Sequence, residues 1–316
     1  MENLLELCSG RYCGRIKNES SGWSDCTACP VGYRSDDLKL CQKCVDSPDL
    51  YEWMYLGFMA MLPLTLNWLC ILIYNHKWSS PAVIIQMVSS FFESFTAAIL
   101  SLLIYEPRGS LTLLSCKVVQ ISDWYTVFFN PTIKYTTTVF CAQEAVYPLY
   151  SIVFLCYLFS LAMLVLLRPI AYSLLPKPSR NKLFTKTLYA TLYFHPILVA
   201  VHAVCAGLLY YSYPYLTMFT TVLATVTYYV KCDAMTLKKI LDKDLSKHIF
   251  AMVWHLLTLC AAAVSIIIST YTFLTWKNLL FLLCTPFPMI FFLLTERFSD
   301  PTNIAQEMDM MNRNTV

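Results

Sequence analysis

"WMYLGFMAMLPLTLNWLCILIY", residues 53–74, is the stretch that decides the fold class. It carries no charged side chain, and it is long enough to cross a bilayer, which takes about 20 apolar residues in a helix. The whole chain agrees: 57% of its 316 residues are hydrophobic and 14% are charged, whereas a soluble domain is nearer half apolar and a quarter charged. The sequence therefore predicts an all-α membrane protein. The net charge of +3 gives little support to nucleic-acid binding.

Further apolar stretches follow the first at residues 82–105, 146–167, 188–211, 215–230, 248–269 and 278–294. Pro214 separates the fourth stretch from the fifth, since proline interrupts helices, and the last stretch is short and contains Pro286 and Pro288. We expect about seven transmembrane helices, two within residues 51–105 and five within 146–294. Residues 106–145 are expected to form an ordered loop with short strands at the membrane face, and residues 295–316 to form a tail.

Residues 1–50 are polar, and no apolar run precedes the first cysteine, so no cleavable signal peptide is expected. This head contains two Cys-x-x-Cys pairs, a spacing that fits both a zinc site and a disulfide-stapled module. Its six cysteines are Cys8, Cys13, Cys26, Cys29, Cys41 and Cys44. The side of the membrane on which the head lies decides between the two chemistries, because disulfides persist only in oxidising compartments.

The basic residues predict the orientation. With the N-terminus outside, the inside loops carry 13 Lys and Arg residues, Arg168 among them, and the outside loops after the first span carry 4. Positive loops face the cytosol, so we expect a lumenal head and a cytosolic tail. Disulfides are then the expected chemistry, with Cys116 paired to Cys141, and the four-cysteine zinc site is the rival. The sequon at Asn18 is expected to carry a glycan.

Ionisable residues at membrane depth are costly and mark candidate sites. They are Glu93 in the second span, His195 and His202 on one face of the fourth, and His255 in the sixth. One interpretation is a polar groove or ion path lined by Glu93 and His202, as in a transporter or channel-like protein. The other, which we favour, is a set of hydrogen bonds between helices, with Glu93 protonated or paired.

Motifs for catalysis are lacking. The sequence has no zinc-protease helix, no Gly-x-Ser-x-Gly elbow and no phosphate-binding glycine loop, so neither an enzyme nor a cofactor is expected. A receptor with a cysteine-rich ectodomain is a further alternative. "LLRP" follows the third span where a small-ligand receptor would carry Asp-Arg-Tyr.

Six phrases together resemble the Jun-kinase-associated membrane protein family. They are "CSGRYCG" (8–14), "SPDLYEWMYLGFMAMLPL" (47–64), "SDWYT" (122–126), "EAVYPLYSIVF" (144–154), "LLRP" (166–169) and "GLLYYSYPY" (207–215). The resemblance extends to about residue 230, and residues 231–247 and the tail diverge from the family pattern.

The resemblance implies a multi-span protein of the endoplasmic reticulum, found also at the cell surface. It implies an adaptor that recruits proteasomes and ubiquitin ligases to misfolded clients and prolongs stress-activated (Jun) kinase signalling. It brings no catalytic, cofactor or metal residue, and the divergent tail leaves kinase binding as its weakest implication.

Overall fold

The structure, a computed structural model, describes residues 8–17, 22–74, 80–130, 141–173, 182–231, 245–270, 280–288, 290, 291 and 295. Five helices in this part of the chain are long and apolar enough to cross a membrane: α1 (Leu50–Tyr74), α2 (Pro81–Ile104), α3 (Ser151–Ser173), α4 (Lys182–Lys231) and α6 (Leu245–Thr270). The strands are confined to a small disulfide-rich head. The all-α membrane class is thus confirmed, whereas the count of seven spans is not.

The two missing spans have different explanations. The predicted fourth and fifth spans lie in one helix, α4, which runs through Pro214. Its apolar part, Thr185–Tyr228, has 44 residues, which at 1.5 Å each extend about 66 Å, twice the roughly 30 Å core of a bilayer. The predicted seventh span is described only in part: a short 3-10 helix, η4 (Leu280–Cys284), is followed by α-helical residues at 287, 288, 290 and 291.

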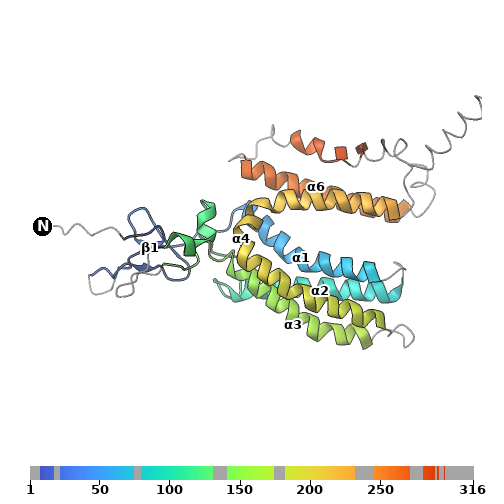
Figure 1. Ribbon diagram of the computed structural model, residues 1–316, viewed down its shortest axis with the longest axis horizontal. Helices are drawn as coiled ribbons and strands as arrows, with labels where there is room; N and C mark the ends of the chain where they lie inside the picture. The colour runs from blue at the N-terminus through green and yellow to red at the C-terminus, as the bar shows by residue number, and fades with distance from the viewer. Residues whose placement is uncertain are drawn as a thin grey trace, which may run out of the picture. The chain divides into compact units, whose positions relative to one another are not determined.

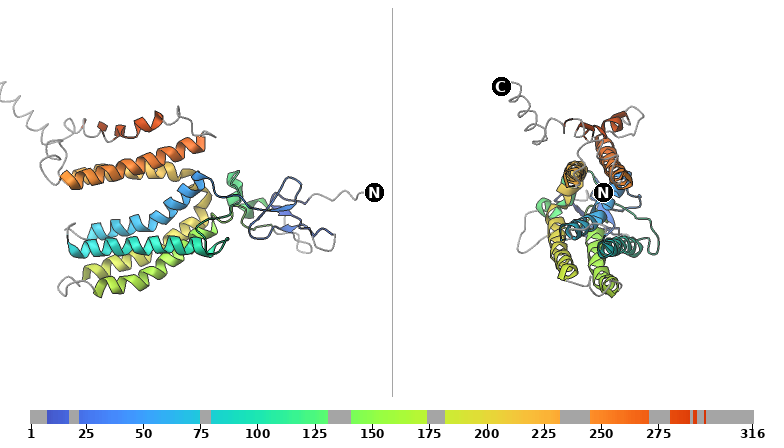
Figure 2. Two further views of the ribbon diagram at one scale, coloured as in Figure 1. Left: turned by 180° about the vertical axis from the view of Figure 1, so that it is seen from behind. Right: turned by 90° about the vertical axis from the view of Figure 1, so that its right-hand side faces the viewer.

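The chain divides into two compact units, Met1–Tyr210 and Tyr211–Val316. In the first unit α1, α2, α3 and the first half of α4 lie side by side as a bundle (Figures 1 and 2). Their outward residues are apolar, among them Leu69, Ile84, Phe95, Leu158 and Val165, as contact with lipid requires. In the second unit α6 packs against η4, and Cys260 of α6 lies 3.4 Å from the hydroxyl of Thr285.

The third span differs from its predicted position. It was expected at residues 146–167, ending before Arg168, but α3 begins at Ser151 and continues through Pro169 to Ser173. Arg168 was counted among the cytosolic loop residues, and this assignment is wrong: its side chain is 1% exposed inside the bundle. A charged side chain can lie within a span when it is paired there, and Arg168 is paired with Glu93.

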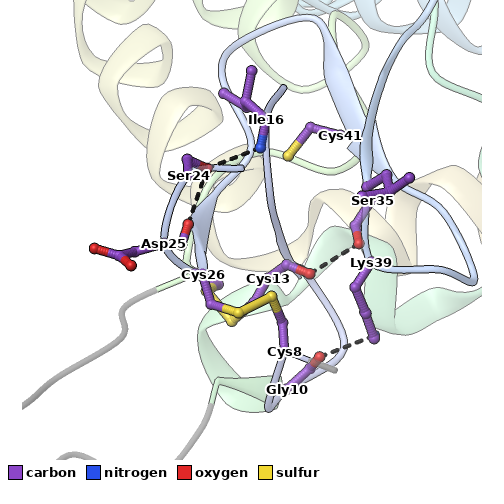
Figure 3. Close-up of a disulfide and its surroundings, with 12 residues drawn as sticks. Cys8, Gly10, Cys13, Ile16, Ser24, Asp25, Cys26, Ser35, Lys39 and Cys41 are labelled. Atoms are coloured by element: carbon purple, nitrogen blue, oxygen red, sulfur yellow. Dashed lines mark hydrogen bonds between the residues drawn. A yellow bond between two sulfur atoms is a disulfide. The ribbon is translucent and has the colours of Figure 1, made fainter. Parts of the chain in front are cut away.

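The head is built from two short antiparallel pairs. Strand β1 (Cys13–Gly14) pairs with β2 (Thr27–Ala28), and β3 (Tyr33–Ser35) pairs with β4 (Cys41–Lys43). Side chains hold the loops between them, as Figure 3 shows: the Ser35 hydroxyl donates to the Cys13 carbonyl at 2.9 Å, and Lys39 Nζ donates to the Gly10 carbonyl at 3.0 Å. Because so small a module has little apolar core, covalent links supply its stability.

The eight cysteines of the head and of loop 106–145 form four disulfides: Cys8–Cys26, Cys13–Cys141, Cys29–Cys41 and Cys44–Cys116. The predicted bond between Cys116 and Cys141 is wrong. Each of these two loop cysteines is joined to the head instead, because the loop folds against the head rather than closing on itself. In neither Cys-x-x-Cys pair are the two cysteines bonded to each other.

The described part of loop 106–145 contains two 3-10 helices, η1 (Ile121–Trp124) and η2 (Thr126–Phe129), where short strands were expected. Its one strand-like contact there is an isolated bridge from Ser115 to Asp46. The loop and the head therefore form one folded layer at the end of the bundle. Residues 131–140 and the sequon at Asn18 lie outside the described residues.

Candidate functional site

The bundle contains a buried ion pair between two helices. Nε of Arg168 in α3 donates to Oε1 of Glu93 in α2 at 2.6 Å, and Nη2 donates to Oε2 at 3.2 Å. Both side chains are 1% exposed. Two parallel contacts from one guanidinium fix both the distance and the orientation of the two side chains, which a lysine ammonium cannot do.

Polar groups from α1, α2 and α4 complete this site. Nη2 of Arg168 also donates to the Ser90 hydroxyl at 2.7 Å and to Oδ1 of Asn67, in α1, at 3.1 Å. The Thr191 hydroxyl, in α4, donates to the same Asn67 oxygen at 2.5 Å. One cluster thus joins α1, α2, α3 and α4 at a single level. We call these five residues the Arg168 cluster.

The cluster extends along α4. Nδ1 of His195 lies 2.8 Å from the Thr191 carbonyl, and Nε2 lies 3.2 Å from the Ser160 hydroxyl. One turn before Thr191, the Thr187 hydroxyl donates to Oε1 of Gln86 at 2.8 Å. His195 was predicted as a polar candidate at membrane depth, and it lies next to the cluster.

The structure does not bring His202 to Glu93. Nε2 of His202 lies 2.9 Å from the Tyr150 carbonyl, its ring stacks on the Tyr150 ring at 5.2 Å, and Phe154 covers its edge at 4.8 Å. The alternative interpretation, a groove lined by Glu93 and His202 together, is therefore not formed in this geometry, whereas Glu93 is paired as in the favoured interpretation. His255 belongs to the second unit, where its ring lies 6.4 Å from that of Tyr228.

The buried pair acts as a tie between helices. Both carboxylate oxygens of Glu93 accept from Arg168, and the Ser89 hydroxyl adds a third donor at 2.8 Å. Both oxygens of this buried carboxylate therefore have hydrogen-bond donors from α2 and α3. Removal of either partner would leave a charge buried without compensation, which is the costly event in such sites.

A second polar centre joins the head to loop 106–145. Asp123 of η1, which is 1% exposed, accepts from the Tyr12 hydroxyl at 2.9 Å, from Arg34 Nη2 at 2.9 Å and from the backbone N–H of Val119 at 2.9 Å. Burial raises the pKa of Tyr12 to about 12, so its hydroxyl remains a donor at physiological pH. Two residues of the head therefore dock on one carboxylate of the loop.

The residue after Asp123 docks the loop on the helices. The Trp124 ring lies 5.8 Å from that of Tyr55 in α1 and 5.1 Å from that of Tyr210 in α4. Gly207 makes this possible, because a Cβ there would lie 2.8 Å from Cβ of Trp124 and 2.7 Å from Cε2 of Tyr125. The phrases "SDWYT" and "GLLYYSYPY" thus meet in space.

Sequence reasoning missed Arg168 and Asp123 as site residues. Arg168 was read as the cytosolic end of a span, although its position, next to an apolar run that continues beyond Pro169, was the available signal. Asp123 stood in a mixed loop without any periodic pattern. Its neighbours in the site come from residues 12 and 34, a separation that no local pattern reveals.

A model of the JNK1/MAPK8-associated membrane protein family matches residues 8–301. Proteins named JNK1/MAPK8-associated membrane protein from Mus musculus and Homo sapiens are 42% and 41% identical over 310 residues, covering 96% of this chain and 97% of theirs. A Caenorhabditis elegans homolog is 31% identical over 286 residues, covering 90% of this chain and 86% of its own. No solved structure matches. The chain therefore belongs to the JNK1/MAPK8-associated membrane protein family.

Proposed function

We propose that this protein is a non-enzymatic adaptor of the endoplasmic reticulum membrane. It recruits proteasomes and ubiquitin ligases to misfolded clients and modulates stress-kinase signalling. The observation that carries the proposal is family membership across 96% of the chain, with relatives whose names state an association with JNK1/MAPK8. The degradation role follows from the resemblance of the six phrases quoted above to the family.

The Arg168 cluster supports a structural rather than a transporting bundle. An acid that carries protons or ions through a membrane must exchange them with a polar path. The two oxygens of Glu93 are instead occupied by Arg168 and Ser89. A bundle tied in this way is a stable platform for loops that bind partners.

The disulfides and the charges support a lumenal head. Two bonds, Cys13–Cys141 and Cys44–Cys116, join the head to loop 106–145, and such bonds persist in oxidising compartments. With Arg168 removed from the count, the predicted inside loops of the seven-span arrangement keep 12 basic residues against 4 in the predicted outside loops. A glycan at Asn18 is the expected mark of this orientation. A protease added to sealed microsomes would then remove a C-terminal tag and spare the head.

A second candidate, a transporter-like protein, is favoured by one observation. Nη1 of Arg168 is buried and has no hydrogen-bond acceptor among the described residues. A polar substrate or an ion shell would have a donor available there. The two candidates differ in where function resides: in the exposed loops for an adaptor, and in the Arg168 cluster for a transporter.

The deciding experiment measures clearance of a misfolded membrane client under folding stress. One variant replaces residues 232–244, between α4 and α6, with a Gly/Ser linker, and another removes residues 296–316. We expect both to slow clearance and to lose proximity labelling of proteasome subunits. The matched control, Glu93→Gln with Arg168→Met, removes both charges of the cluster and is expected to support clearance. A folded control that fails, beside tolerated loop and tail variants, would favour the transporter.

A further inference from the structure

A groove of about 180 Å³ opens in the half of the bundle nearest the head. Its walls come from the first turns of α1 and α3 and the last turns of α2. The lining includes Trp53, Gly57 and Ala60 of α1, Ala98 and Ser101 of α2, and Ile152 of α3. These positions lie outside the Arg168 cluster, so the groove is a separate feature of the same bundle.

Small side chains create the groove. Gly57 is exposed, and a Cβ added to it would meet nothing within 4 Å. Ala60 on the same helix and Ala98 on α2 are also small lining residues. Polar chemistry is satisfied within the wall, since the Ser101 hydroxyl donates to the Ala98 carbonyl at 2.8 Å. The groove therefore offers an apolar surface with no free polar group at Ser101.

We propose that this groove binds one acyl chain of a phospholipid from the leaflet nearest the head. The volume is slightly larger than the 150 Å³ of an apolar cavity that holds benzene, so a run of several methylenes fits. A whole helix does not fit, because its diameter with side chains is about 10–12 Å.

The position of the groove selects a lipid as the occupant. Trp53 is the fourth residue of α1, and tryptophan side chains gather where the hydrocarbon meets the headgroups. A groove with Trp53 in its wall begins at the depth where acyl chains leave the glycerol. Gly57 and Ala60 lie one and two turns deeper, in the direction that a chain takes into the bilayer.

The test uses the full chain in phosphatidylcholine vesicles that contain a trace of phosphatidylcholine with a diazirine in one acyl chain. Illumination attaches the lipid, and mass spectrometry locates it. We expect concentrated labelling of residues 53–60 and 98–102. Gly57→Leu fills the groove and should abolish this excess labelling. Ala60→Leu repeats the test at a second position if Gly57→Leu fails to fold.

Thr65→Leu is the matched control, because Thr65 is exposed on the same face of α1, two turns beyond Gly57, and lies outside the groove lining. It should leave the labelling unchanged. Even labelling along all lipid-facing helices would overturn the proposal, and so would undiminished labelling in folded Gly57→Leu. In cellular membranes, a photoreactive residue in place of Leu102 should yield lipid adducts. A protein adduct as the main product would assign the groove to a partner helix instead.

Discussion

The guanidinium of Arg168 holds both carboxylate oxygens of Glu93, at 2.6 Å through Nε and 3.2 Å through Nη2, and thereby joins α3 to α2 inside the membrane. The same guanidinium reaches α1 through Asn67, and Thr191 brings α4 to that amide. Four helices that would otherwise slide along apolar surfaces are fixed at one level. The register of the bundle therefore depends on one charge pair.

Glu93→Gln should reveal this dependence. An ordinary hydrogen bond between membrane helices is worth about 0.6 kcal/mol, but removal of one partner from a buried pair costs roughly 3–5 kcal/mol. We expect Glu93→Gln to lower the free energy of unfolding by an amount in the larger of these two ranges, measured by thermal unfolding in detergent. Glu93→Gln combined with Arg168→Met should recover most of the loss. A single variant as stable as the native chain would contradict the ion pair.

Gly207→Ala tests how the loop docks on α4. The added Cβ would lie 2.7 Å from Tyr125 and 2.8 Å from Trp124. Both neighbours are ring systems packed in place, so we expect a destabilisation of about 1–3 kcal/mol, as for other overpacked sites. Hydrogen exchange should rise in residues 120–130.

Gly57→Ala is the control for Gly207→Ala. It makes the same change in a helix, at a position where a Cβ meets nothing within 4 Å. Alanine is about 0.5–1 kcal/mol better than glycine in a helix interior, so the control should be neutral or stabilising. Equal destabilisation by both variants would show that the crowding at Gly207 has no role.

The disulfides should differ in their effect on stability. Cys13–Cys141 links positions 128 residues apart, whereas Cys29–Cys41 links positions 12 apart. The chain-entropy model gives about 5 kcal/mol for the longer loop and about 3 kcal/mol for the shorter. Replacement of both cysteines of a bond by serine avoids a free thiol. The Cys13 and Cys141 double variant should unfold at a lower denaturant concentration than the Cys29 and Cys41 double variant. Peptide mapping without reduction should identify the four bonds. A Cys116–Cys141 peptide would refute the described connectivity.

Much of the fold could be predicted because a membrane span is recognised from one continuous run of apolar residues. The apolar run at residues 53–74 needs no partner to be recognised, and it coincides with α1. The end of the third span could not be placed, because the burial of Arg168 depends on Glu93, 75 residues earlier. A local reading assigns a charge to a loop, and only the tertiary structure supplies the partner that keeps it inside.

The candidate site was predicted in part for the same reason. Glu93 and His195 stood out because polar residues are rare at that depth, and both lie at or beside the cluster. The alternative interpretation, a groove lined by both Glu93 and His202, is not formed, because two residues at similar depth in the membrane can lie at different positions around the bundle. The prediction of a Cys116–Cys141 disulfide failed for a related reason. The positions of cysteines in the sequence do not show that the loop folds onto the head.

Glu144 gives a prediction for pH. Its Oε1 lies 3.3 Å from the backbone N–H of Tyr150 and 3.4 Å from that of Ser151, at the start of α3. Burial raises the pKa of this carboxyl from 4.5 to about 7, against the smaller opposing effect of these hydrogen bonds. The folded chain therefore binds a proton that the unfolded chain has released between these two values.

The sign of the effect follows from that difference. Where the folded state holds more protons, stability falls as pH rises, so the chain should lose up to roughly 3 kcal/mol between pH 4.5 and pH 7 through this group. Glu144→Gln keeps an acceptor oxygen for α3 and removes the titration. Burial also raises the pKa of the neighbouring Tyr105, to about 12, so that phenol does not titrate in this window. Denaturant unfolding at pH 5, 6, 7 and 8 should show a steeper decline for the native chain than for Glu144→Gln. Parallel profiles would mean that the carboxyl ionises at its ordinary pKa and that burial does not control its charge.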